Sequence, residues 1–94
     1  MRIKSLSHLK ELLKGREQLD CFILLLNGNA RSSKTLLPHE DGSLTIFNEI
    51  DSSEINLASV EKLQTTKKSN IFEAIQKGSF FVYDYEIKKG DDAK

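Results

Sequence analysis

Three consecutive segments with strand-like patterns constrain the fold of this chain more than any other feature: residues 20–27, 31–37 and 44–50. The first is a continuous apolar run, which is typical of a central strand, and the third alternates between apolar and polar residues. Turn-forming residues separate the segments, at Asn27–Asn29 and again at Glu40–Ser43. The sequence therefore predicts three successive antiparallel strands.

Helical patterns flank these strands. Residues 5–15 carry leucines at helical spacing, and residues 59–65 and 70–77 predict two shorter helices. Residues 51–57 are predicted to form an acidic loop, and residues 79–86 a final strand. The element order is α-β-β-β-α-α-β. This order predicts an α+β fold with a mostly antiparallel four-stranded sheet packed on helices.

Capping residues support the helix boundaries. Ser5 or Ser7 can cap the first helix. Asn70 and Glu73 have the spacing of a capping box at the start of the last helix, and Gly78 is a natural residue to end it. We therefore expect the last helix to begin directly after Asn70.

The charge is distributed unevenly along a chain that is expected to form one domain over residues 1–87, with a flexible C-terminal tail at residues 88–94. Residues 40–61 contain six acidic residues and no Lys or Arg, a balance of −6. Residues 1–39 have a balance of +4 and residues 62–77 a balance of +3. This pattern predicts either an electrostatic match within the fold or an acidic contact face.

Several functional classes have little support in the sequence. Cys21 has no partner for an internal disulfide, and we expect a buried side chain in a cytoplasmic protein. The longest apolar run, from Cys21 to Leu26, is too short to cross a membrane. Neither His8 nor His39 has metal-ligand spacing around it. We therefore expect no membrane association, no metal, no cofactor and no catalytic residues.

One segment comes close to a phosphate-binding loop. The residues from Gly28 to Thr35 read G-x-x-x-x-S-K-T, with Ser33 in place of the second glycine of that motif. Pro38 follows within one helical turn and would prevent the helix that such loops require. A chain of 94 residues is also too short for the parallel sheet of such enzymes. Nucleotide hydrolysis is therefore disfavoured.

The last predicted strand is rich in aromatic residues. Residues 77–83 partly match the signature of RNA-recognition motifs, but Ser79 replaces an aromatic residue and the element order differs from that fold. Phe81, Tyr83 and Tyr85 share one face of the strand. Two interpretations remain open. The rings could pack the sheet against a helix, or they could be exposed and stack on bases or anchor a protein partner.

A polar cluster is predicted where the second and third strands pair. A hairpin around Gly42 would place residue i opposite a residue numbered between 80−i and 84−i. This brings Arg31 and Lys34 near Glu49, Asn48 and Asp51. The cluster could consist of cross-strand charge pairs, or it could form a site for an anion or a partner carboxylate. The candidate binding residues are Arg31, Ser32, Ser33, Lys34, Asn48, Glu49, Asp51, Glu54, Tyr83 and Tyr85.

The chain also resembles a known group of sequences. The resemblance is carried by Asp20–Ile23, Gly28, Arg31–Lys34, Phe47–Asp51, Ser69–Ile71, Glu73–Ile75 and Gly78. These motifs are similar to those of a family of small uncharacterised proteins of bacterial plasmids, conjugative elements and phages. The resemblance implies a mobile-element accessory protein that binds and modulates a host or element protein. An anti-defence inhibitor of the anti-CRISPR type is one such role.

Two functions of different kinds follow as hypotheses. The first is a non-enzymatic protein-binding modulator that uses the acidic residues 40–61 or the aromatic strand as its contact face. The alternative is a small nucleic-acid or anion-binding module that uses Arg31, Lys34 and the strand tyrosines, with Lys67 and Lys68 beside them. A third hypothesis, an unrecognised enzyme, would require a polar cleft.

Overall fold

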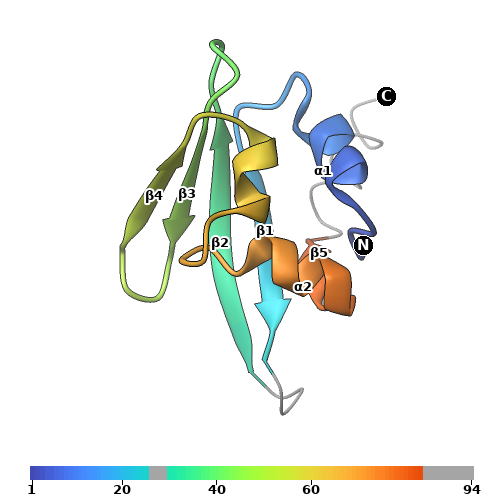
Figure 1. Cartoon of the computed structure of the whole chain (residues 1–94). Helices are drawn as coiled ribbons and strands as arrows, with labels where there is room; N and C mark the ends of the chain where they lie inside the picture. Colours follow the sequence, from blue (N-terminus) through green and yellow to red (C-terminus); the bar gives the residue numbers. More distant parts are fainter. Residues whose placement is uncertain (26–29, 84–94) are drawn as a thin grey trace, which may run out of the picture.

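The computed structural model describes residues 1–25 and 30–83. Its strands form one antiparallel sheet in the order β4-β3-β2-β1-β5, and its helices cover one face of that sheet (Figure 1). The elements are α1 (Leu6–Leu13), β1 (Leu19–Leu24), β2 (Arg31–Pro38), β3 (Leu44–Asn48), β4 (Glu54–Leu57), the 3-10 helix η1 (Val60–Gln64), α2 (Ile71–Lys77) and β5 (Phe80–Val82). The predicted α+β class and the antiparallel sheet are confirmed.

The sheet has five strands, and the prediction of four is wrong because residues 51–57 are not a loop throughout. The second half of that segment is β4, in which Ile55 pairs with Ile46 and Leu57 pairs with Leu44. The two apolar residues alternate with polar ones and add to the helix-covered face of the sheet. The acidic residues around them hid this short alternation in the sequence.

Other element boundaries also differ from the prediction. The helix expected at residues 59–65 is the 3-10 turn η1, and the first and third strands end earlier than predicted, at Leu24 and Asn48. The turn expected at Asn27–Asn29, the end of the strand predicted at residues 79–86 and the tail at residues 88–94 lie outside the described residues.

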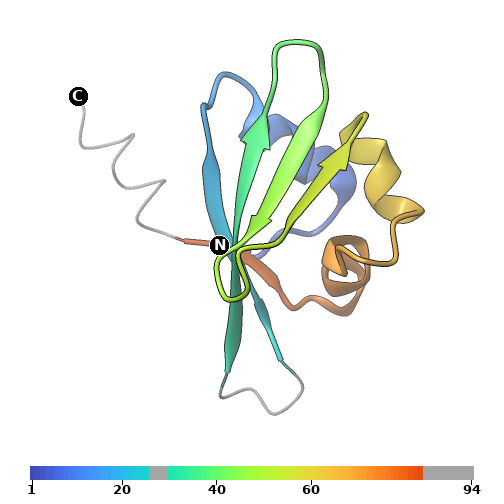
Figure 2. The same cartoon turned by 90° about the vertical axis from the view of Figure 1, so that its left-hand side faces the viewer.

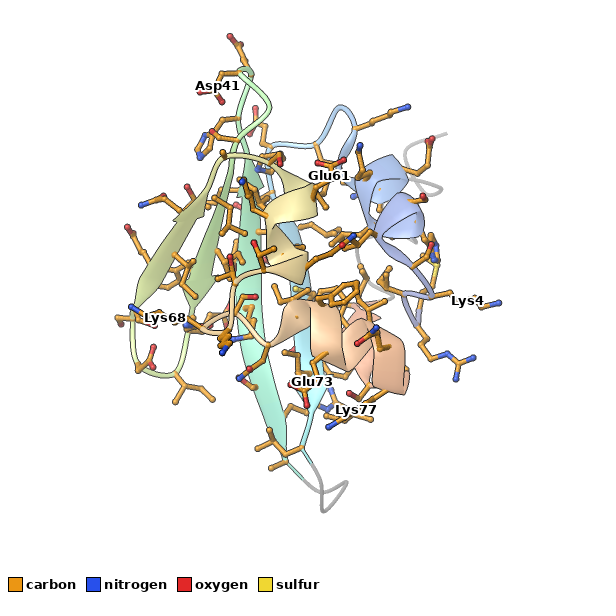
Figure 3. All side chains as sticks on the ribbon, viewed as in Figure 1. Lys4, Asp41, Glu61, Lys68, Glu73 and Lys77 are labelled. Atoms are coloured by element: carbon orange, nitrogen blue, oxygen red, sulfur yellow. The ribbon has the colours of Figure 1, made fainter. Side chains whose placement is uncertain are left out.

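The predicted capping box at α2 is absent. Asn70 does occupy the N-cap position, but it has the left-handed conformation (φ 58°) and its side chain makes no capping hydrogen bond. Glu73 instead accepts a hydrogen bond from Lys77 one turn further along, at 2.7 Å (Figure 3). Gly78 ends the helix in the left-handed conformation, as predicted. At α1, Ser5 is the N-cap and accepts a hydrogen bond from the backbone N–H of His8.

The observed register of the β2–β3 hairpin lies within the predicted range. Lys34 lies opposite Asn48 and Pro38 opposite Leu44, so paired residue numbers sum to 82. β2 begins at Arg31 as a strand, and this excludes the helix of a phosphate-binding loop at that point.

The core lies between the sheet and the helices. Each strand contributes alternate residues to it, among them the fully buried Cys21, whose burial was predicted. The buried apolar residues are Ile3, Leu9, Leu13, Leu19, Cys21, Ile23, Leu36, Leu44, Ile46, Leu57, Leu63, Ile71, Ala74, Ile75, Phe80 and Val82.

The N-terminus extends the sheet beyond β5. Met1 and Val82 exchange hydrogen bonds, from each nitrogen to the other residue's carbonyl oxygen, both at 2.8 Å. The N–H of Ile3 donates to the carbonyl oxygen of Phe80 at 2.9 Å. The side chain of Ile3 is 0% exposed, so this segment is anchored by the core as well as by its backbone.

This anchoring gives a stability test. Ile3→Ala should lower the free energy of unfolding by about 2–5 kcal/mol, because it leaves a cavity in the core. Ile50→Ala is the matched control, since Ile50 is 72% exposed and its truncation should change stability by less than about 0.5 kcal/mol. Urea denaturation of the two variants measures both values. Equal losses would contradict the anchoring role of Ile3.

Candidate binding surface

One face of the sheet is free of the helices that the structure describes. Directly opposed residues of antiparallel strands point to the same face, so the pairing determines which side chains lie there. The helices pack on the other side, and none of the described elements covers this one (Figure 2). We call it the open face; its strand residues include Asp20, Phe22, Leu24, Arg31, Ser33, Thr35, Leu37, Thr45, Phe47, Glu54, Asn56 and Phe81.

An aromatic stack lies on β1 and β5 within the open face. The rings of Phe22 and Phe81 are stacked, with centroids 5.3 Å apart and an angle of 10° between their planes. Tyr83 tilts against Phe22 at 4.8 Å, and the guanidinium carbon of Arg31 lies 4.6 Å from the centroid of the Phe22 ring. These side chains are half-buried by one another, apart from the exposed Arg31. The arrangement is a preformed platform of rings with one cation on it.

Carboxylates border this platform. The hydroxyl of Thr35 lies 3.2 Å from an oxygen of Asp20 and 3.1 Å from an oxygen of Glu49. One hydroxyl has a single proton, so it can donate to only one of the two carboxylates at a time. Ser33 and Tyr83 form a separate hydrogen bond at 3.0 Å between their hydroxyls. The two carboxylates therefore retain capacity to accept hydrogen bonds from a cationic group of a partner.

Lys34 lies on the opposite, helix-covered face. It pairs with Cys21 on one side and Asn48 on the other, and its residue surface is only 6% exposed. Its ammonium group donates to the side-chain oxygen of Asn48. The amide nitrogen of Asn48 donates in turn to the hydroxyl of Ser53 at 2.6 Å. Lys34 thereby organises the turn between β3 and β4.

The same turn is held by Asp51. One carboxylate oxygen of Asp51 accepts hydrogen bonds from the backbone N–H and the hydroxyl of Ser53, at 2.9 and 2.7 Å. These bonds, mainly the one from the Ser53 hydroxyl, lower the pKa of Asp51. Ser52, between them, has a left-handed backbone (φ 57°). The predicted cluster around Asn48 and Asp51 thus has a structural role in this turn.

Burial perturbs two groups beneath the sheet. Desolvation lowers the pKa of Lys34, and the carboxylate of Asp51 offsets this in part. Desolvation raises the pKa of the Cys21 thiol, which therefore stays protonated and behaves as a small apolar side chain.

The candidate residues predicted from the sequence are divided between two faces. Arg31 and Ser33 lie on the open face, whereas Ser32 and Lys34 point to the helix side. A single anion therefore cannot contact both Arg31 and Lys34 on one side of the sheet. Their positions were predictable once the strand was assigned, because side chains alternate along it.

Other predicted residues lie on or beside the open face. Glu54 is exposed there, opposite Phe47, and Tyr83 joins the ring stack. Phe81 and Tyr83 pack the sheet against none of the described helices, so that interpretation is wrong for these two rings as far as the described residues extend. Tyr85 lies outside the described residues.

Sequence reasoning missed several residues of the open face, among them Phe22 in the aromatic stack and Asp20 and Thr35 beside it. Phe22 was assigned to a continuous apolar run that gave no indication of which side would stay open. The signal that could have found it is the pairing of β1 with β5, which sets Phe22 opposite Phe81.

Comparisons with known proteins add no relative. A scan against protein-family models, a search of curated proteins and a search of solved structures each found no match to this chain. In the described part of the chain, no helix is long and apolar enough to cross a membrane. The same residues contain no group of three or more His, Cys, Asp or Glu side chains placed to hold a metal ion.

The buried amine gives a pH-dependent prediction. Folding lowers the pKa of Lys34 below its ordinary value of 10.5. At pH values between the folded-state pKa and 10.5, the unfolded chain therefore binds more protons than the folded chain. The free energy of unfolding should therefore rise with pH across this alkaline window, and Lys34→Met should abolish that rise. Denaturant titrations at several pH values measure it.

Two choices isolate the effect of Lys34 on the pH dependence of stability: a background substitution at Cys21 and a control variant at Lys68. Both proteins should carry Cys21→Ala, because the raised pKa of the thiol has the opposite sign and makes stability fall as pH increases. Lys68→Met is the matched control, since Lys68 is exposed (Figure 3) and its loss should leave the slope unchanged. The same slope with and without Lys34 would contradict the assignment.

Proposed function

We propose that this protein binds and modulates another protein, of a host cell or of a mobile genetic element, through the open face. The observation that carries this proposal is the stack of Phe22, Phe81 and Tyr83 on a sheet face that no described element covers. Half-buried rings on a rigid sheet can bury further apolar area on binding with little loss of side-chain freedom. Tyrosine and arginine beside such rings are frequent anchors in protein interfaces.

The charges of the open face favour a basic partner. Asp20, Glu49 and Glu54 lie on or beside this face, whereas the described strands β1–β5 contribute one cationic side chain to it, Arg31. The partner surface that complements it presents Lys or Arg side chains next to apolar groups. Inhibition of an anti-defence kind would follow if that basic surface is one the partner needs for its own substrate.

The same charges do not favour nucleic acid as the ligand. Phosphate backbones require several basic side chains, and Lys34 is turned to the helix side and buried. Rings on an open sheet can stack on bases, but the neighbouring carboxylates of Asp20 and Glu49 would repel the phosphates. Protein binding is therefore the function that the geometry supports best.

Charge reversal tests the proposal. The double variant Glu49→Lys/Glu54→Lys should lose the captured partner, because it replaces two exposed carboxylates of the contact region with ammonium groups. The matched control is Glu17→Lys/Glu40→Lys, which makes the same change in charge at exposed positions outside the five strands. Immobilised proteins are incubated with a bacterial lysate, and the recovered proteins are quantified.

The expected result is one protein that is recovered by the wild type and by the control and is reduced about tenfold or more with the open-face variant. Direct titration with the purified partner then checks the difference in affinity. Equal recovery by both double variants, or no specific recovery by the wild type, would refute the proposal.

Oligonucleotide binding provides an independent test. Fluorescence anisotropy with single- and double-stranded oligonucleotides at low ionic strength should show no binding by the wild type. Strong binding that weakens steeply with salt and is lost in Arg31→Glu would favour the nucleic-acid module instead.

A further inference from the structure

The two edges of the sheet differ in whether another described segment pairs with them. The outer edge of β5 is hydrogen-bonded to the N-terminal residues Met1–Ile3. β4 pairs with β3 on one side, and no other described strand lies along its outer side. Figure 1 shows β4 at the margin of the sheet, and Figure 2 shows it facing the viewer with no element in front of it. Unpaired backbone groups at such an edge are a template for another strand.

The hydrogen-bond pattern identifies the backbone groups that point outward. The N–H of Asn48 donates to the carbonyl oxygen of Ser53 at 2.9 Å, so these two residues are a hydrogen-bonded pair. Such pairs alternate along an antiparallel ladder, so Ile55 and Leu57 also bond inward to β3. The N–H and C=O groups of Glu54 and Asn56 therefore face away from β3.

The side chains along this edge are held in place. The hydroxyl of Thr45 donates to the side-chain oxygen of Asn56 at 2.7 Å, and the ring of His39 lies 2.8 Å from the same hydroxyl. Glu54 is exposed on the open face, and Ile55 is half-buried on the helix side. An added strand would meet a fixed backbone, an apolar neighbour on one face and a carboxylate on the other.

We propose that the outer edge of β4 receives an extended segment of a partner protein as an additional strand, with a Lys or Arg side chain of that segment facing Glu54. This inference rests on the proposed function, that the ligand is a protein, and specifies its mode of binding. Main-chain hydrogen bonds to Glu54 and Asn56 would provide affinity, and the carboxylate would select for a basic residue. The partner strand would also extend the open face.

Charge argues for a basic segment rather than a second copy of this chain. All six charged side chains among Asp, Glu, Lys and Arg in residues 40–61 are acidic, and β4 lies within that segment. Edge-to-edge pairing of two copies would bring like charges of Glu54 and the adjoining turn together. A strand with Lys or Arg next to Glu54 instead gains a favourable cross-strand pair.

A synthetic peptide tests the inference directly. The probe is an acetylated and amidated peptide of alternating Lys and Val residues, and the matched control is the same peptide with its alternate backbone nitrogens methylated along one edge. Amide chemical shifts and hydrogen exchange of the full-length protein report where each peptide binds. The unmethylated peptide should slow exchange at the amides of Glu54 and Asn56 by about tenfold or more.

The methylated peptide, with its Lys nitrogens blocked, should bind about tenfold more weakly, since the edge that places Lys opposite Glu54 can no longer donate inter-strand hydrogen bonds. Glu54→Lys should weaken binding of the unmethylated peptide, whereas Glu40→Lys, in the turn between β2 and β3, should not. No binding, or equal binding of both peptides, would overturn the inference. Dimerisation of the protein with protection of these amides would overturn the choice of occupant.

The location of the response separates this inference from the proposed function. A peptide that perturbs Phe22, Phe81 and Tyr83 but leaves the amides of Glu54 and Asn56 unprotected would refute strand addition and leave binding at the open face intact. A second combination of results would also refute strand addition and leave binding at the open face intact. In it, Glu49→Lys/Glu54→Lys loses the partner captured from the lysate, but the wild type binds no peptide at β4.

Discussion

The backbone pairing of β2 with β3 is the constraint on which the rest of the structure depends. In this pairing Lys34 lies opposite Asn48, and the backbone N–H of Glu49 bonds to the carbonyl oxygen of Ser33 at 3.2 Å. Because successive side chains point to opposite faces, this one register decides the face of every residue in both strands. A slip of β3 by one residue relative to β2 would turn Leu44 and Ile46 to the open face and remove them from the core, while Leu36 of β2 stayed buried.

The same register explains why the two basic residues of β2 have different environments. Arg31 is on the open face and stacks on Phe22, where its charge stays exposed. Lys34, three residues later, is on the helix side, where its ammonium group is desolvated and bonded to Asn48. Burying a charge is unfavourable unless it is well paired, so Lys34 contributes most by fixing the turn before β4. The basic run in the sequence therefore has two separate physical roles.

Much of the fold follows from local sequence patterns. The parts that could not be predicted from such patterns have identifiable physical reasons. The hairpin register was predictable because turn residues around Gly42 (φ 90°) and the alternation of β3 specify it together. β4 was not predictable, since it has only two apolar residues, Ile55 and Leu57, and gains its strand structure from its neighbour β3. Tertiary pairing outweighed local composition there.

The candidate surface was harder to predict than the fold for a related reason. The apolar run of β1 indicated burial on both faces, yet Phe22 is covered on its outer side by Phe81 and Tyr83 rather than by one of the described helices. Those rings come from β5 and the residue that follows it, far along the sequence, and only the strand order brings them next to Phe22. The carboxylates of Asp20 and Glu49 likewise meet at Thr35 through pairing across three strands.

The acidic segment, residues 40–61, protects the β4 edge of the sheet and also selects what can bind there. An exposed edge strand risks pairing with any extended chain, and a charged side chain on the edge reduces that risk. Glu54 has this position on β4, while Met1–Ile3 cover the opposite edge. A carboxylate opposes pairing with acidic or purely apolar strands and favours basic ones. Because Glu54 also borders the open face, the same charge that protects the edge would orient a basic partner toward the aromatic platform.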